Sequence, residues 1–202
     1  GIGIQDWDGG LVENNIITQL TDVGNTRGII VSGTACRNID IRQNTIFHLN
    51  DSSAQIELNS GEAGWNILVE ENEVQSPGLD STVIQSDSGV LSGYTFLNNS
   101  YVSGKRSDRR FKINGNLARS FNEWVAASGE TGSQDGVLAY PDPTRNVARY
   151  NASIGGSEDF LDFIAEVRQQ SKWNWREEYT AASVNAYIRD GFRGSYATNG
   201  DL

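Results

Sequence analysis

Apolar and polar residues alternate over short stretches of the first 125 residues of this 202-residue chain, and one six-residue pattern recurs among them. The pattern is apolar-x-x-Asn-x-apolar, and its asparagines are Asn15, Asn44, Asn72 and Asn99. Successive asparagines are 29, 28 and 27 residues apart. A repeat of this length that is carried by short strands is typical of a solenoid, in which each repeat forms one coil.

A second series of short alternating runs precedes the asparagine motifs. Glycine, serine, aspartate and asparagine flank these runs, as expected of strands between sharp turns. The runs are residues 1–5, 28–31, 54–58, 81–85 and 110–113. Together the two series predict an all-β solenoid of about five coils, with at least two strands in each coil. We expect the repeated asparagine to occupy a tight corner in a left-handed conformation and to bond to the matching asparagine of the next coil.

The pattern changes after residue 125. Glycines and prolines are frequent up to residue 156, which predicts a closing loop segment pinned by Tyr140 and Tyr150. Apolar residues then recur at helical spacing over about 158–171, after Ser157 as a cap, and over about 178–190. Phe160, Leu161 and Ala182 are among the residues expected to face inward, but two such helices are too small to form a core alone. We expect Trp124 to begin the closure of the solenoid, and Trp173 and Trp175 to pack between the helices and the solenoid. The predicted domains are a solenoid over 1–125, a closing segment over 126–156 and a helical extension over 157–202 that packs on the solenoid.

Composition and charge exclude several classes of function. The net charge of −10 and the pI near 4.5 argue against nucleic acid or an anionic membrane as a general partner. No apolar run approaches the roughly 20 residues that a membrane span needs. Cys36 and His48 are the only residues of their types, so an internal disulfide and a histidine-rich metal site are excluded, and we expect both to be structural.

The first residues already read as a strand, with no capping element before them. Solenoids normally shield their terminal coil, because an open strand edge pairs with other chains. We therefore expect this chain to be a C-terminal portion whose partners include earlier coils of the same protein.

Residues 28–46 and 66–74 resemble the repeats of right-handed parallel β-helix proteins of the pectate-lyase-like superfamily, and the similarity extends over about residues 1–125. The segment 142–192 is similar to C-terminal extensions of secreted bacterial β-helix proteins, including planctomycete-like ones. The resemblance implies a right-handed parallel β-helix with a two-helix extension, located outside the cytoplasm as a secreted or cell-surface protein that acts on polysaccharide. Arg27 stands where polygalacturonase-like hydrolases have a catalytic aspartate, which argues against their mechanism.

A basic window is the sharpest local feature of this acidic chain, because 6 of its 16 basic residues lie between positions 105 and 119. Arginine forks bind carboxylate or sulfate groups of sugars, and a lysine or arginine can act as the base in β-elimination. We predict a catalytic role for Lys112, Arg110 and Lys105 and substrate binding by Arg106 and Arg109. The alternative is a solvated loop whose charges form ion pairs.

Outward positions of the first strand series form a second candidate. Glu57, Gln85 and Lys112 are expected to point out of the solenoid on successive coils, and Trp7 is placed to stack on a sugar ring. The resemblance implies that carboxylates near such a sheet act as acid and base or hold a calcium ion. The available carboxylates are Asp6, Asp8, Asp51, Glu57, Asp80 and Asp87. The alternative is that the aspartates at the coil corners are turn formers.

Two functions follow from these features. The first is a polysaccharide lyase or glycoside hydrolase that acts on an acidic glycan. The second is a non-catalytic glycan-binding, adhesive or structural β-helix module. Outward lysine, arginine and glutamate gathered across adjacent coils favour the enzyme, whereas a flat face of asparagine and serine favours the module.

Overall fold

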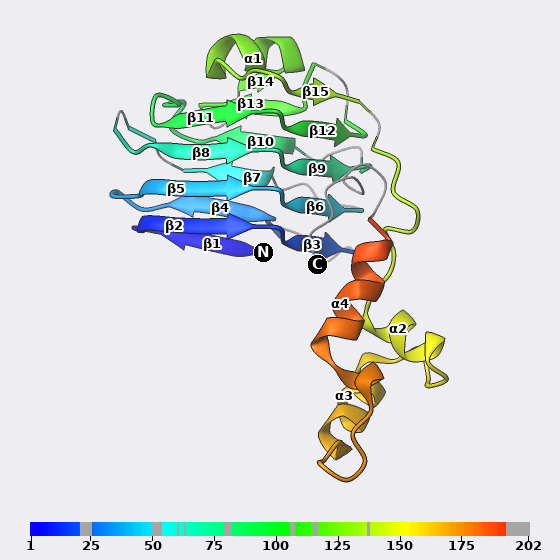
Figure 1. The fold of residues 1–202 in the computed structure, drawn as a ribbon. Helices are drawn as coiled ribbons and strands as arrows, with labels where there is room; N and C mark the ends of the chain where they lie inside the picture. The colour runs from blue at the N-terminus through cyan, green and yellow to red at the C-terminus, as the bar shows by residue number, and fades with distance from the viewer. Residues whose placement is uncertain are drawn as a thin grey trace. The chain divides into compact units, whose positions relative to one another are not determined.

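The computed structural model describes residues 1–20, 26–49, 54–59, 61–62, 64–78, 82–105, 108–114, 117–136 and 138–192. The chain divides into two compact units, Gly1–Leu138 and Ala139–Leu202. The first unit is a β-solenoid and the second is helical (Figure 1). No helix in these described ranges is long and apolar enough to cross a membrane.

Three sheets of parallel strands form the solenoid, and we name them sheets A, B and C (Figure 1). Sheet A contains β1 (Ile2–Gln5), β4 (Ile29–Ser32), β7 (Ala54–Leu58), β10 (Thr82–Ser86) and β13 (Phe111–Ile113). Sheet B contains β2 (Asp8–Glu13), β5 (Arg37–Arg42), β8 (Ile67–Glu70) and β11 (Tyr94–Leu97). Sheet C contains β3 (Ile16–Gln19), β6 (Thr45–His48), β9 (Glu73–Ser76), β12 (Ser100–Ser103) and β15 (Gln134–Asp135). Each coil therefore contributes one strand to each sheet, and the predicted all-β solenoid is confirmed.

The solenoid is shorter than the five coils predicted. All three sheets are continuously paired from the coil of β1, β2 and β3 to the coil of β10, β11 and β12, which is three coil-to-coil steps. After β13 the chain reverses into the antiparallel strand β14 (Leu117–Arg119) and then forms helix α1 (Phe121–Ser128) instead of a strand of sheet B. The helix forms because Ser120 and Glu123 make a capping box and Gly129 ends it with a φ of 70°.

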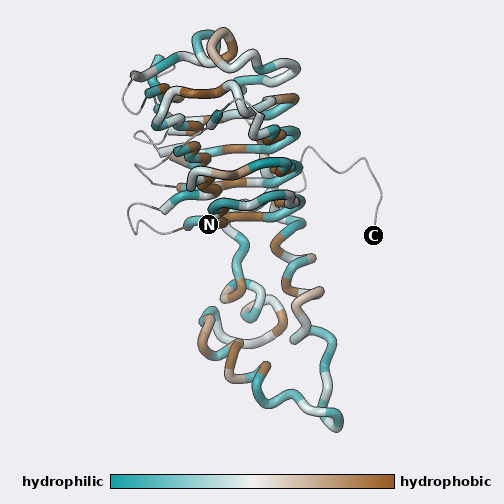
Figure 2. The backbone as a smooth tube through the Cα atoms, turned by 90° about the vertical axis from the view of Figure 1, so that its left-hand side faces the viewer, coloured by the Kyte–Doolittle hydropathy of each residue, from teal (hydrophilic) through white to brown (hydrophobic). Residues whose placement is uncertain are grey.

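Helix α1 closes one end of the interior, as predicted for Trp124. The Trp124 side chain is 0% exposed and stacks on Phe111, with ring centroids 5.5 Å apart and planes at 17°. Below it, apolar side chains occupy the same inward position of successive coils, as in the register Ile29–Ile56–Ile84–Phe111. Figure 2 shows these hydrophobic segments recurring from coil to coil.

Cys36 and His48 are both buried in the solenoid, as expected for structural residues. The Cys36 thiol donates a hydrogen bond to the backbone oxygen of Ser32 at 3.1 Å. His48 lies at the end of β6, and its backbone oxygen accepts a 3.0 Å bond from the Ser76 hydroxyl.

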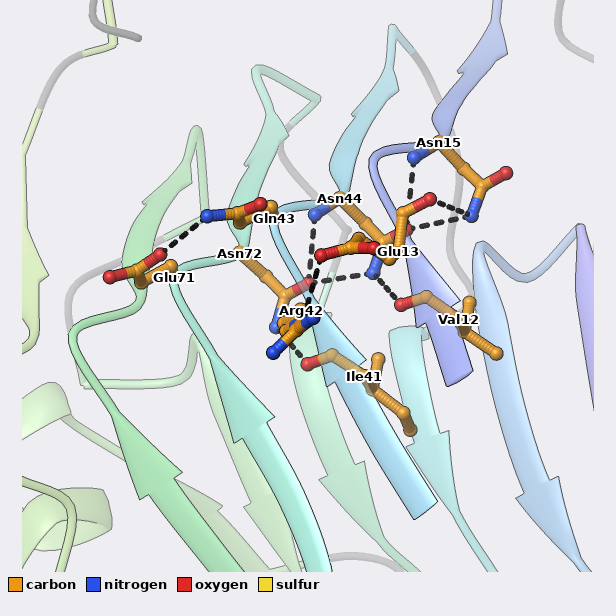
Figure 3. A network of polar contacts seen from close by, with 9 residues as sticks. All are labelled: Val12, Glu13, Asn15, Ile41, Arg42, Gln43, Asn44, Glu71 and Asn72. Atoms are coloured by element: carbon orange, nitrogen blue, oxygen red, sulfur yellow. Dashed lines mark hydrogen bonds and ion pairs between the residues drawn. The ribbon is translucent and has the colours of Figure 1, made fainter. Parts of the chain in front are cut away.

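The repeated asparagines form a hydrogen-bonded ladder between sheets B and C, as predicted (Figure 3). Asn15 donates both its backbone N–H and its Nδ2–H to Oδ1 of Asn44, at 3.1 and 2.9 Å. Asn44 donates in the same way to Asn72, and Asn72 to Asn99, at 2.9–3.1 Å. Between the asparagines themselves, each donates to the later coil and accepts from the earlier one, which gives the ladder a direction. The second Nδ2–H of Asn44, Asn72 and Asn99 donates at 2.9 Å to a backbone oxygen of the earlier coil, that of Val12, Ile41 and Val69 respectively, and Figure 3 shows the first two of these bonds.

The left-handed corner residue is not the ladder asparagine itself, which corrects our expectation. Instead the residue before it has a positive φ in every coil, with values of 53–56°. These residues are Asn14, Gln43, Glu71 and Asn98. The turn therefore leaves the ladder asparagine in an extended conformation just before the next strand. Its side-chain amide then points along the stack of coils. Gln43 also donates a 2.9 Å bond to Glu71 on the outside of this corner (Figure 3).

The donor end of the ladder terminates on a buried carboxylate, Glu130, which is 3% exposed. Its Oε1 accepts from Asn99 Nδ2 at 2.8 Å, from the Tyr101 hydroxyl at 2.8 Å and from the Ser133 hydroxyl at 2.5 Å. Its Oε2 accepts from Trp124 Nε1 at 2.6 Å. One acceptor-only side chain thereby satisfies four donors, two from the last full coil, one from α1 and one from Ser133.

The second unit has a small core of its own, whereas we expected two helices without one. It contains α2 (Val147–Ser153), α3 (Phe160–Gln169), the 3₁₀-helix η1 (Glu177–Tyr179) and α4 (Ala181–Asp190). Tyr150, Phe163 and Val184 are the buried centre of its apolar cluster. Helix α2 occupies part of the predicted loop, because Asn146 caps its first turn.

Three details of the helical prediction were wrong. Asp159 caps α3 in place of Ser157, whose hydroxyl donates to Asp162. Phe160 and Leu161 in α3 are exposed rather than buried, as is Ala182 in α4. Trp173 and Trp175, expected to pack, are 89% and 63% exposed. A hydrogen-bonded turn between Ser171 and Asn174 holds this segment, so no helix turns the two rings inward.

Replacing a central ladder residue should cost much more than replacing the first one. Asn72→Ala removes the oxygen that satisfies two Asn44 donors, and we expect the free energy of unfolding in urea to fall by about 3 kcal/mol. Asn15→Ala is the matched control and should cost about 1 kcal/mol, because no described residue donates to its side chain. Equal losses would contradict the directional ladder.

Alkaline pH should destabilise the solenoid through two buried tyrosines. Burial raises the pKa of Tyr94, and burial together with the Glu130 charge raises the pKa of Tyr101 well above its usual value. Each native phenol keeps its proton while the unfolded chain ionises, so stability is retained below about pH 10 and falls above it by about 1.4 kcal/mol per pH unit per tyrosine. Urea unfolding at pH 9 to 11 measures the slope, which Tyr94→Phe should reduce. Ionisation of both residues near pH 10 in the folded protein, seen at 295 nm, would refute this.

Candidate functional site: the outer face of sheet A

One row of side chains crosses the outer face of sheet A. Strand register aligns Ile30 with Glu57, Glu57 with Gln85, and Gln85 with Lys112. Their chain neighbours Ile56 and Ile84 are fully buried, so the row itself points away from the core. Adjacent members are about 4.8 Å apart, the spacing of neighbouring strands.

The Glu57 carboxylate is held on both oxygens and its side chain is only 7% exposed. Arg27 Nε donates to Oε2 in an ion pair. The Asn59 amide lies between two carboxylates, so its nitrogen and not its oxygen is assigned to that side; so oriented, it donates to Glu57 Oε1 at 2.8 Å. Glu57 is therefore a fixed group whose charge is paired with that of Arg27.

Asp87 joins the same network from the next position along the strands. Its Oδ2 accepts from Asn59 at 2.9 Å, and its Oδ1 accepts from Gln85 Nε2 at 2.5 Å. The charges of Arg27, Glu57, Asp87 and Lys112 cancel in sum. This face is therefore a rigid, polar and electrically balanced surface with a cation at one end.

The structure disperses the basic window. Arg110 turns toward sheet C, where its Nη1 lies 2.5 Å from Asp135 Oδ1, and its Nε donates to the Lys105 backbone oxygen at 3.2 Å. Asp135 stands in register with the buried Tyr101, so this ion pair ties sheet A to sheet C at the end of the core. Arg109 is exposed, and Arg106 lies outside the described residues.

Lys112 is thus the predicted basic residue that lies on the row. Its side chain is half-buried, and no described residue forms an ion pair or side-chain hydrogen bond with it. Trp7 is far from it, because four strand spacings, about 19 Å, separate β1 from β13. Trp7 lies across Gly10, where a side chain would come within 2.8 Å of the indole, and is 39% exposed.

The described residues do not cluster potential metal ligands. They contain no group of three or more histidine, cysteine, aspartate or glutamate residues placed to hold a metal ion. Calcium takes six to eight oxygen ligands, and the carboxylates nearest to each other on this face, Glu57 and Asp87, are bridged by the Asn59 amide. Asp6 binds the amides of Thr34 and Ala35 as a turn former. Asp51 and Asp80 lie outside the described residues.

Two members of the network were not predicted as site residues, Arg27 and Asn59. The sequence prediction includes Arg27 only as a departure from a hydrolase motif and does not include Asn59. The repeat pattern contains the information to find both residues. Arg27 lies at the start of the coil that precedes the coil of Glu57, and Asn59 lies two residues after Glu57 on the same face. A search for opposite charges one coil apart identifies Arg27, and the alternation of side chains along a strand identifies Asn59.

Comparisons with protein-family models, with curated proteins and with solved structures returned no match. The description of this chain as a parallel β-helix rests on its own strand pairing and on the asparagine ladder.

The Arg27–Glu57 pair should show strong coupling in a double-mutant cycle. Arg27→Met leaves a nearly buried carboxylate without its cation, and we expect a loss of about 2 kcal/mol, limited by the 42% exposure of the Arg27 side chain. Adding Glu57→Gln should restore at least about 1 kcal/mol. Urea unfolding of the four proteins measures the coupling, and additive losses would show that the pair contributes nothing.

Proposed function

We propose that this chain binds a carboxylated glycan along the outer face of sheet A, as an extracytoplasmic β-helix module. The observation that carries the proposal is the in-register row Glu57–Gln85–Lys112 across three coils. Its spacing of about 4.8 Å per strand is close to the length of one sugar unit in an extended polysaccharide.

The bonding within the row supports binding better than catalysis. Hydrolysis by two carboxylates needs one protonated acid and one free carboxylate on either side of the scissile bond. Glu57 and Asp87 instead use all their oxygens to hold Arg27, Asn59 and Gln85 in place. Because Glu57 is nearly buried in this network, Gln85 and Lys112 are the members of the row that offer preorganised polar groups to a ligand at low entropic cost.

Lys112 gives the face its preference for an acidic sugar. In this proposal its ammonium group binds one carboxylate of the glycan, and exposed Arg109 adds a second cation near the same end. Asp87 disfavours a dense polyanion across the middle of the row, since like charges repel. The proposed ligand therefore carries separated carboxylates, as in a polyuronate or a mixed uronate polysaccharide.

A polyuronate lyase is the second candidate, and Lys112 is the observation that favours it. In β-elimination a base removes the proton at C5 of a uronate, the C4–C5 double bond forms, and the glycosidic oxygen at C4 leaves. Lys112 lies on the row without a described side-chain partner, and under this candidate it acts as that base. Under this candidate the chain is a member of the pectate-lyase-like superfamily, similar to secreted bacterial β-helix proteins.

Affinity electrophoresis in gels that contain polygalacturonate or alginate tests the binding function. We expect retardation of the native protein and about tenfold weaker binding for Lys112→Gln, from the loss of one charge-assisted bond. Lys172→Gln in the helical unit is the matched control and should bind like the native protein. Neutral dextran should give no retardation.

The same protein preparation distinguishes the binding module from the lyase. A rise in absorbance near 232 nm during incubation with the polyuronate, lost in Lys112→Gln, would establish the lyase. Retardation without that rise would establish the binding module. Migration unchanged by every acidic glycan would disprove both.

A further inference from the structure

One face of the solenoid presents three strand edges. β1, β2 and β3 stand at the ends of sheets A, B and C, so each is paired on one side only within the described strands. β1 and β3 contain neither proline nor a charged residue, the usual devices that block an edge. The first coil therefore offers a ring of backbone donors and acceptors suited to further strand pairing.

The asparagine ladder is incomplete on the same face. Oδ1 of Asn44, Asn72 and Asn99 each accepts two N–H groups from the preceding coil. No described residue donates to Oδ1 of Asn15, and Figure 3 shows this oxygen directed away from the rest of the ladder. The open corner is thus an acceptor that lacks its two donors.

The opposite end is closed. β15 pairs with β12, and Thr131 bridges to Leu97 of β11. Asn99 donates its side-chain N–H to Glu130 and its backbone N–H to Ser133. The donor end of the ladder is therefore already satisfied inside the same unit.

We propose that the face formed by β1, β2 and β3 is a docking surface for another parallel β-coil that carries an asparagine at the corner facing Asn15. Such a coil supplies the backbone pairs for three edges and the two N–H donors for Oδ1 of Asn15. Hydrogen bonds give the affinity, as in strand addition to an exposed sheet edge, and the asparagine sets the register.

A second copy of this chain does not meet these requirements. A two-fold dimer places the same surface against itself, so two Asn15 oxygens face each other as acceptors. Head-to-tail stacking needs a free donor end, and Glu130, Ser133 and helix α1 occupy that end. The polarity of the ladder therefore selects a coil of the matching direction.

Duplication of residues 1–27 in front of Gly1 of the full chain tests the proposal. The junction places Arg27 before Gly1 as it normally precedes Gly28, and the added asparagine stands 27 residues before Asn15, the spacing between Asn72 and Asn99. Hydrogen exchange followed by mass spectrometry reports on β1, β2 and β3. We expect exchange of their amides to slow by at least about tenfold relative to the native chain.

A matched control carries Asp in place of Asn only at the added position corresponding to Asn15. The aspartate has no side-chain donor, so protection at the corner between β2 and β3 should fall back toward the native level. Unchanged exchange in β1–β3, a disordered added coil, or equal protection by the aspartate control would overturn the proposal. So would a native dimer in sedimentation that protects these same strands, because the occupant would then be a second copy.

Discussion

The double donation from each ladder asparagine to one oxygen of the next coil is the constraint on which the solenoid depends. An amide side chain has both donor and acceptor, and only this combination repeats indefinitely along a stack. Because Oδ1 receives a backbone N–H as well as Nδ2–H, the corner must hold the peptide and the side chain together. The bend before each asparagine, with its left-handed residue, follows from that requirement.

A ladder with a direction has two different ends, and the protein treats them differently. At the donor end a carboxylate is the one common side chain that accepts several bonds without offering a proton in its ionised form, and Glu130 fills this role. Helix α1 and the Arg110–Asp135 pair cover the core beside it. Arg110, which the sequence suggested as a sugar-binding or catalytic residue, therefore helps to close this end of the solenoid.

Much of the solenoid was predictable because its signal is periodic. The spacing of Asn15, Asn44, Asn72 and Asn99 predicted the stacking, and alternation around Glu57 and Lys112 predicted which side chains face out. Glu130 was not predictable, since its partners are contributed by three segments and only the closed end brings them together. Arg110 and Lys112 look equivalent in sequence, yet the first turns to Asp135 and the second stays on sheet A, a difference that depends on where the neighbouring sheet ends.

The contrast between the tryptophans makes the two units optically distinct. Trp65 and Trp124 lie in the dry interior of the solenoid, whereas Trp173 and Trp175 of the helical unit are in water. Emission from the first pair belongs at short wavelength and is shielded from iodide, while the second pair emits at long wavelength and is readily quenched. Trp7 of the solenoid unit is 39% exposed and adds to the quenchable emission. Once Trp7 is replaced by Phe, the protein carries an intrinsic two-colour label, with which melting of each unit can be followed separately in one fluorescence experiment.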